Sequence, residues 1–291
     1  MLSTSALTVK LSISRFGMRK KDAVVTDETN RNYNAVKDAG NYNKALFNLK
    51  DPLVAAVQAA ASEARKYHAE MTLPWGERGE RCLPSKVVME YRDQMENVYK
   101  PKFMHAVTEF VDAYARLKSQ AEIDLGMMFN ENDYPPVSKV EEAFDFSITL
   151  EPIADPSDFR LKIQESELER LKAEYAANNE AKTQAAMADL WNRLYTVVAK
   201  MATTLDDDEK TFKNTLVGNI ASLTEILPRL NMANDPALDA MSRKINEELC
   251  TYTPDDLRKN KEVRKETSKT AKEICEAMQG YMGNLPKEEA A

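Results

Sequence analysis

The chain has 291 residues, of which 43% are hydrophobic and 30% charged, and its net charge is −7. This balance predicts a folded globular protein and excludes both a disordered chain and a small disulfide-stabilised domain. The three cysteines are odd in number and far apart, which indicates a reducing compartment, the cytoplasm of the cell. We expect neither a secretory signal nor a membrane-spanning helix, because no apolar run is long enough.

Strict alternation of apolar and polar residues predicts the first strand, over 7–14. A turn near Gly17 and a basic run lead to 23–26, where we expect a short pairing strand that makes a hairpin with a basic tip. The Asn- and Tyr-rich stretch that follows is broken at Gly40. It predicts a short helix and a loop.

Asp51 and Pro52 form a cap-then-proline pair, which predicts a helix over 52–71. The next segment, as far as Ser85, contains two prolines and two glycines and is typical of an irregular loop. Ser85 is expected to cap a further helix, and Pro101 should kink or divide that helix.

A second alternating strand is predicted over 144–151, and another strand over 160–163. From about Ser166 onward the apolar spacing is helical throughout, with Pro228 expected to bend or end one helix early. The fold class is therefore α+β, mainly α, with a small antiparallel sheet packed by helices plus a C-terminal helical bundle. We expect an α+β lobe over 1–163, which carries the basic N-terminal segment, and an all-helical lobe over 164–291. The long helix near Ser166 also suggests a homo-oligomer.

Local patterns give no catalytic, metal-binding or cofactor-binding residues. The chain lacks a Walker A loop, a GxGxxG turn, a GxSxG elbow and a CxxC pair. Its two histidines, His68 and His105, lie inside predicted helices, where structural positions are more common than metal or acid–base roles. An enzyme whose site is assembled from distant residues stays open as an alternative.

Positive charge gathers near the amino terminus. Residues 9–50 contain nine basic and four acidic side chains, a net charge of +5, which leaves −12 for the rest of the chain. Phosphates attract cations, whereas unstacked bases prefer aromatic rings and amides, so the segment suits single-stranded nucleic acid. Protein contact and a merely solvated face are the alternatives. The candidate nucleic-acid-binding residues are Arg15, Phe16, Arg19, Lys20, Lys21, Arg31, Tyr33, Tyr42 and Lys44. Because 19–21 are consecutive cations, most of them must be solvated.

A second candidate surface is the loop around Trp75. Trp75, Arg78 and Arg81 are residue types enriched at the centres of protein interfaces, and they lie between two prolines. They are the candidate partner-binding residues. The alternative is that Trp75 fills the core beneath the loop, since large aromatic residues are highly buried on average.

Several stretches together resemble a family of uncharacterised phage and prophage proteins over nearly the whole chain. They are SISRFGMRKK, DAGNYNK, ARKYHAEMTLPWGERGERCLPS, MFNENDYPP, FDFSITLEPIADPSDFRL, LWNRLYTVVAKMA and ILPRLNM. The family has no known activity and thus no functional residues to transfer. The outline is more weakly similar to mobile-element proteins associated with MoxR-like AAA+ ATPases. We therefore expect a non-catalytic phage-type binding or assembly protein; the alternative is a protein-only adaptor or inhibitor acting on a host or AAA+ ATPase partner.

Overall fold

The computed structural model describes residues 2–37, 39–76, 79–155, 163–207 and 209–282. The chain forms two compact units, and each unit is built from separate stretches of sequence. Unit 1 comprises residues 1–10, 69–90 and 149–291, and unit 2 comprises residues 11–68 and 91–148. This division differs from the expected boundary between residues 163 and 164, because the amino terminus and the 69–90 segment group with the C-terminal helices.

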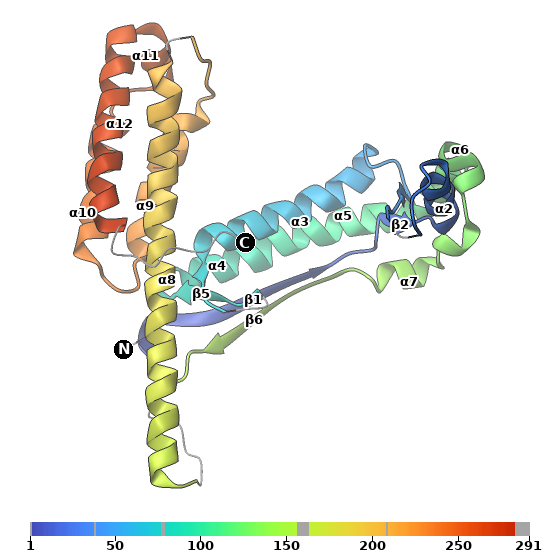
Figure 1. Ribbon diagram of the computed structural model, residues 1–291, viewed down its shortest axis with the longest axis horizontal. Coiled ribbons are helices and arrows are strands. Elements are labelled where there is room, and N and C mark those ends of the chain that lie inside the picture. Colours follow the sequence, from blue (N-terminus) through green and yellow to red (C-terminus); the bar gives the residue numbers. More distant parts are fainter. Residues whose placement is uncertain (1, 38, 77–78, 156–162, 208, 283–291) are drawn as a thin grey trace. The chain divides into compact units, whose positions relative to one another are not determined.

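A small antiparallel sheet has the strand order β4-β5-β1-β6. Its strands are β1 (Ala6–Ser14), β4 (Leu73–Pro74), β5 (Arg81–Pro84) and β6 (Asp145–Pro152). The strands predicted over 7–14 and 144–151 are therefore confirmed as neighbours in one sheet (Figure 1). Phe146 of β6 is buried, and its ring centroid lies 5.8 Å from that of Phe103 in α5 (Lys100–Asp112). A helix of the first half thus covers this part of the sheet, as the one-sided alternation predicts.

The other elements before residue 152 are mostly helices. The α-helices are α1 (Leu2–Ser5), α2 (Ala23–Asn32), α3 (Pro52–Met71), α4 (Val88–Gln94), α6 (Tyr114–Leu125) and α7 (Val137–Glu141). A π-helical turn spans Met95–Tyr99, and 3₁₀ turns lie at Ser85–Val87, Gly126–Met128 and Glu131–Asp133. A separate two-stranded ribbon consists of β2 (Arg19–Lys21) and β3 (Asn43–Ala45). The interruption predicted at Pro101 takes the form of the π-helical turn, after which Pro101 occupies the first turn of α5.

The C-terminal part is helical, as predicted. Its helices are α8 (Glu165–Asp206), α9 (Thr215–Leu230), α10 (Pro236–Leu249), α11 (Pro254–Lys259) and α12 (Lys261–Met282). Asp235 caps α10 by accepting a hydrogen bond from the Ala237 N–H at 2.9 Å, and Thr253 forms a capping box with Asp256 at α11. Among the helices that are described, none is both long enough and apolar enough to cross a membrane.

Two local predictions near the amino terminus are wrong. Residues 23–26 begin helix α2 rather than a strand, because the Asp22 carboxylate accepts a hydrogen bond from the Val25 N–H at 3.1 Å and caps the helix. The basic run 19–21, expected at a hairpin tip, is itself strand β2.

Four further predictions concern the loop after residue 71, Ser85, Pro228 and residues 160–163. The expected irregular loop contains the β4–β5 hairpin, in which Leu73 lies opposite Cys82, and Ser85 is the first residue of a 3₁₀ turn rather than its cap. Pro228 does not end α9 early, because the helix continues to Leu230. The strand predicted over 160–163 falls outside the described residues, apart from its last position.

Candidate nucleic-acid interface

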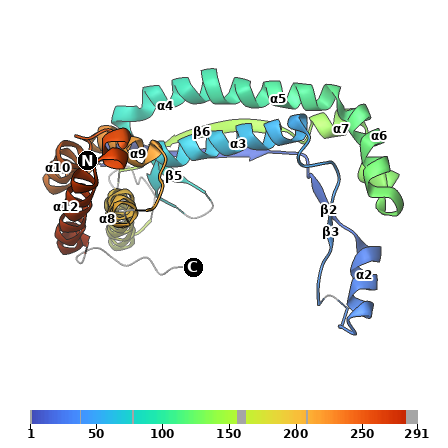
Figure 2. The same cartoon turned by 90° about the horizontal axis from the view of Figure 1, so that it is seen from above.

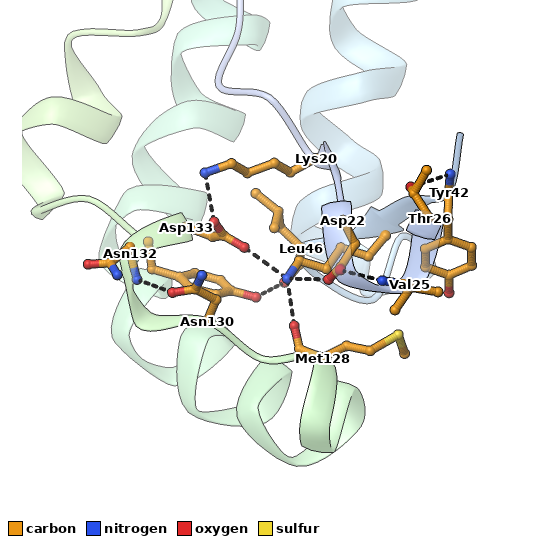
Figure 3. A network of polar contacts seen from close by, with 12 residues as sticks. Lys20, Asp22, Val25, Thr26, Tyr42, Leu46, Met128, Asn130, Asn132 and Asp133 are labelled. Atoms are coloured by element: carbon orange, nitrogen blue, oxygen red, sulfur yellow. Dashed lines mark hydrogen bonds and ion pairs between the residues drawn. The ribbon is translucent and has the colours of Figure 1, made fainter. Parts of the chain in front are cut away.

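The basic residues of β2 are fixed by their pairing with β3 in unit 2. The two strands are antiparallel, and Lys20 lies directly opposite Lys44. Like charges at opposite positions of a strand pair repel, so this register needs a nearby anion. Asp133 supplies it: its Oδ1 lies 2.7 Å from Lys20 Nζ, and its Oδ2 lies 2.9 Å from Lys44 Nζ (Figure 3).

Lys44 is buried, with 4% of its surface exposed. Besides Asp133, its ammonium group contacts the Asp22 carboxylate at 3.0 Å and donates to the Met128 carbonyl oxygen at 2.5 Å (Figure 3). These three partners match the three donors of an ammonium group. The prediction that Lys44 binds nucleic acid is therefore corrected, since Lys44 is enclosed and its donors are occupied.

The network holds all three groups in their charged forms. Burial alone would lower the pKa of Lys44, but its hydrogen bonds and ion pairs with Asp133 and Asp22 raise that pKa above the ordinary 10.5. Burial would likewise raise the pKa of Asp133, but Lys20 and Lys44 lower it below 3.8. The pKa of Asp22 is lowered chiefly by the hydrogen bond from the Val25 N–H, and then by Lys44.

These shifts predict acid sensitivity of unit 2. A carboxyl group whose folded-state pKa is lowered contributes stability above its unfolded pKa, and that stability is lost as the pH falls through the folded value. We expect the contribution of this network to the stability of unit 2 to be constant between about pH 5 and 9, and to be lost below about pH 4. Circular dichroism melts across this range would measure the effect in the transition that the Asp133→Asn variant shifts. The Asp133→Asn variant should melt lower at neutral pH and lose less on acidification; an equal acid-induced loss in both proteins would contradict the assignment.

Arg19 and Lys21 occupy the other face of the ribbon. Neighbouring residues of a strand point to opposite faces, so these two side chains point away from Asp133 when Lys20 points toward it. Both residues are exposed, and Lys20 is half-exposed. The basic run therefore divides into one cation that anchors the ribbon and two that face solvent, which confirms that most of the run is solvated.

Arg15 and Phe16, at the start of the predicted interface, are only partly exposed. Arg15 donates a hydrogen bond to the Gln58 side-chain oxygen on α3. The Phe16 ring centroid lies 6.3 Å from that of Phe47, a buried residue. Both side chains are less exposed than Arg19 and Lys21, which makes them weaker candidates for ligand contact.

The remaining predicted residues lie on α2 and the segment that connects it to β3 (Figure 2). Arg31 is exposed, Tyr33 is 81% exposed and Tyr42 is 40% exposed. Two buried polar residues of α2 hold this segment. Thr26 accepts a hydrogen bond from the Tyr42 N–H at 3.0 Å, and the Asn30 amide donates to the Gly40 carbonyl oxygen at 3.2 Å.

No family model, curated protein or solved structure matches this chain. The chemistry of the candidate surface is therefore argued from its own residues. Cations on the outer face of the ribbon and tyrosine rings on the adjoining segment can contact phosphates and bases respectively.

The second candidate surface, around Trp75, is not assembled as predicted. Trp75 is buried, with 7% of its surface exposed, and Lys182 of α8 lies 5.7 Å from its ring centroid. Arg81 donates to the Thr72 side chain at 2.6 Å and to the Thr72 carbonyl oxygen at 3.0 Å. Trp75 thus fills the core of unit 1 and Arg81 secures the end of α3, while Arg78 lies outside the described residues.

The other polar candidates have ordinary structural surroundings. Buried His68 contacts the Tyr91 hydroxyl through Nδ1 at 2.7 Å, whereas His105 is exposed. Within the described ranges, no group of three or more histidine, cysteine or acidic residues is arranged to hold a metal ion.

Sequence reasoning missed Asp22 and Asp133, the carboxylates that organise the site. Asp22 had a local cue as a helix cap, but Asp133 is brought to the ribbon only by folding.

Proposed function

We propose that this protein is a non-catalytic phage-type binding or assembly protein that contacts single-stranded nucleic acid through its basic N-terminal segment. The observation that carries the proposal is the division of the run 19–21. Asp133 fixes Lys20, and the register then directs Arg19 and Lys21 to the exposed face of the ribbon. A pair of cations on an anchored strand suits contact with successive phosphates, because the backbone that carries them is already fixed before binding.

The preference for single strands rests on Tyr33 and Tyr42. A duplex keeps the faces of its bases stacked on one another, whereas a single strand offers them to aromatic side chains. Both tyrosines are exposed. Tyr42 lies beside the ribbon, where its carbonyl oxygen accepts a hydrogen bond from the Asp22 N–H, and Tyr33 lies at the other end of α2. The two contact types are therefore available on one part of unit 2.

Neutralising the outer face should weaken binding without unfolding the protein. We expect the Arg19→Gln, Lys21→Gln double variant to lose affinity for a single-stranded oligonucleotide, and the slope of log affinity against log salt to fall by about 1.4 if each cation contacts one phosphate. Fluorescence anisotropy at several salt concentrations would measure both quantities. The melting temperature should change little, since exposed substitutions rarely alter stability by more than about 0.5 kcal/mol.

The matched control is the Lys50→Gln, Lys100→Gln variant, which has the same charge change at exposed positions elsewhere in unit 2. It should keep the parental salt slope. If the parent binds no oligonucleotide at low salt, the proposal fails and a protein-only adaptor or inhibitor replaces it.

Self-association stays a prediction. What supports it is that the first part of α8, from residue 165 to residue 185, has no buried side chain.

A further inference from the structure

A short sequence occurs twice in the exposed part of unit 2. The triplet Asn-Tyr-Asn stands at 32–34 and again at 41–43. The first copy ends α2 and follows Arg31, and the second leads into β3. All six residues are exposed, which is unusual for two tyrosines in a folded protein. The repeat therefore presents the same pair of chemistries, an aromatic ring and flanking amides, at both ends of the segment that connects α2 to β3.

The two triplets are held by the same helix. Within the connecting segment, the Ala35 N–H donates to the Asn30 carbonyl oxygen at 2.8 Å, just after the first triplet. The Asn30 side chain reaches the Gly40 carbonyl oxygen, just before the second triplet, and Thr26 binds the Tyr42 N–H. Thr26 and Asn30 are buried and lie one turn apart on α2. Their hydrogen bonds fix the backbone on both sides while leaving the tyrosine rings exposed.

The asparagine side chains differ in what the fold requires of them. Asn34 has a φ of 52°, a left-handed conformation that asparagine adopts more readily than most residues, so its identity has a structural reason. The side-chain amides of Asn32, Asn41 and Asn43 make no hydrogen bond with the described part of the chain, so the fold gives no structural reason for asparagine at these three positions. These amides are free to bind a ligand.

We infer that the two triplets are paired base-binding subsites with a preference for adenine. Tyr33 and Tyr42 would each stack on a base, and the neighbouring amides of Asn32 and Asn41 would bind its edge. An asparagine amide donates and accepts at once, and adenine offers the matching donor and acceptor at N6 and N7. This inference rests on the proposed function and adds base preference to it, which phosphate contacts alone do not supply.

The test uses three oligonucleotides of equal length: oligo-dA, oligo-dT, and oligo-dA in which every adenine is 7-deazaadenine. The last has the same ring shape and the same exocyclic amine as adenine, but lacks the N7 acceptor. By anisotropy, the parent should bind oligo-dA about fivefold or more tightly than the 7-deaza form. The Asn32→Ala, Asn41→Ala variant should lose this ratio and keep the parental affinity for oligo-dT. Asn178→Ala, an exposed position on α8, is the matched control and should keep the ratio.

Stacking is tested separately. The Tyr33→Ala, Tyr42→Ala variant should bind all three oligonucleotides about fivefold or more weakly with an unchanged salt slope, and the corresponding Phe variant should retain parental affinity. Equal parental affinity for oligo-dA and its 7-deaza form, or an unchanged ratio in the asparagine variant, would overturn the inference alone. Absence of binding to every oligonucleotide at low salt would overturn the proposed function as well.

Discussion

The Lys44→Ala variant should lose about 3–5 kcal/mol of the free energy of unfolding of unit 2, the usual loss when one partner of a buried ion pair is removed. The substitution leaves Asp22 without its cation and leaves the buried Asp133 with only the half-exposed Lys20. Each carboxylate must then protonate or take up water, and either change disrupts the pairing of β2 with β3. The loss of protection should therefore be greatest in the ribbon and the segments that enclose it.

The measurement must report on unit 2 itself. Both tryptophans, Trp75 and Trp191, belong to unit 1, so their fluorescence does not follow this change. Hydrogen exchange with mass spectrometry would follow it, through peptides covering 19–46 and 126–135. The control is Lys20→Met, which removes an exposed ion-pair partner and should cost about 1 kcal/mol or less. Equal exchange rates in Lys44→Ala and the parent would show that the network does not stabilise unit 2.

A second large effect is expected at Arg264 in unit 1. This arginine of α12 is buried, and it donates to the carbonyl oxygens of Thr204 at 3.1 Å, Leu205 at 3.2 Å and Lys210 at 2.9 Å, and to that of Asp207. The last carbonyl groups of a helix lack partners within the helix, and Arg264 supplies them at the end of α8. Its guanidinium also lies 5.3 Å from the Phe212 ring centroid.

We expect Arg264→Leu to destabilise unit 1 by about 3 kcal/mol or more, because the buried carbonyl groups of Thr204 and Leu205 and two partly buried ones lose their donor together. Arg264→Lys should recover little of this, since an ammonium group cannot reproduce the planar fork of a guanidinium. Urea unfolding followed by tryptophan fluorescence would measure both variants. Arg243→Leu, at an exposed position on α10, is the control and should change stability by no more than about 0.5 kcal/mol. A similar small change at Arg264 would contradict the role given to it.

The elements that sequence predicted well are those whose pattern is long and local. The alternation over 7–14 and the cap-then-proline pairs at Asp235 and Thr253 each specify their element without help from distant residues. The short strands were harder. Residues 19–21 are all cationic and have no alternation, so only pairing with β3 and the contact with Asp133 make them a strand.

The candidate interface shows the same limit. Sequence identified a basic, Asn- and Tyr-rich segment and the solvation of most of the run 19–21. It could not separate Lys44 from the other cations, because the carboxylate that buries it, Asp133, is 89 positions away in the chain. The prediction that the Trp75 loop binds a partner was wrong for a related reason. The sequence pattern of an aromatic residue between prolines is the same whether that residue faces solvent or packs near a helix such as α8.

The interleaving of the two units has a consequence for the order of synthesis. Every residue of unit 2 has been made once residue 148 is added, whereas unit 1 needs helices that extend beyond residue 260. Residues 6–9 of β1 can pair with residues 81–84 of β5 by then, but β4 and β5 must wait for contacts with α8 and α9, which the ribosome makes much later. Contacts of such long sequence separation form slowly. Once further synthesis has carried residue 148 out of the ribosomal tunnel, the β2–β3 ribbon can be assembled before α12 exists.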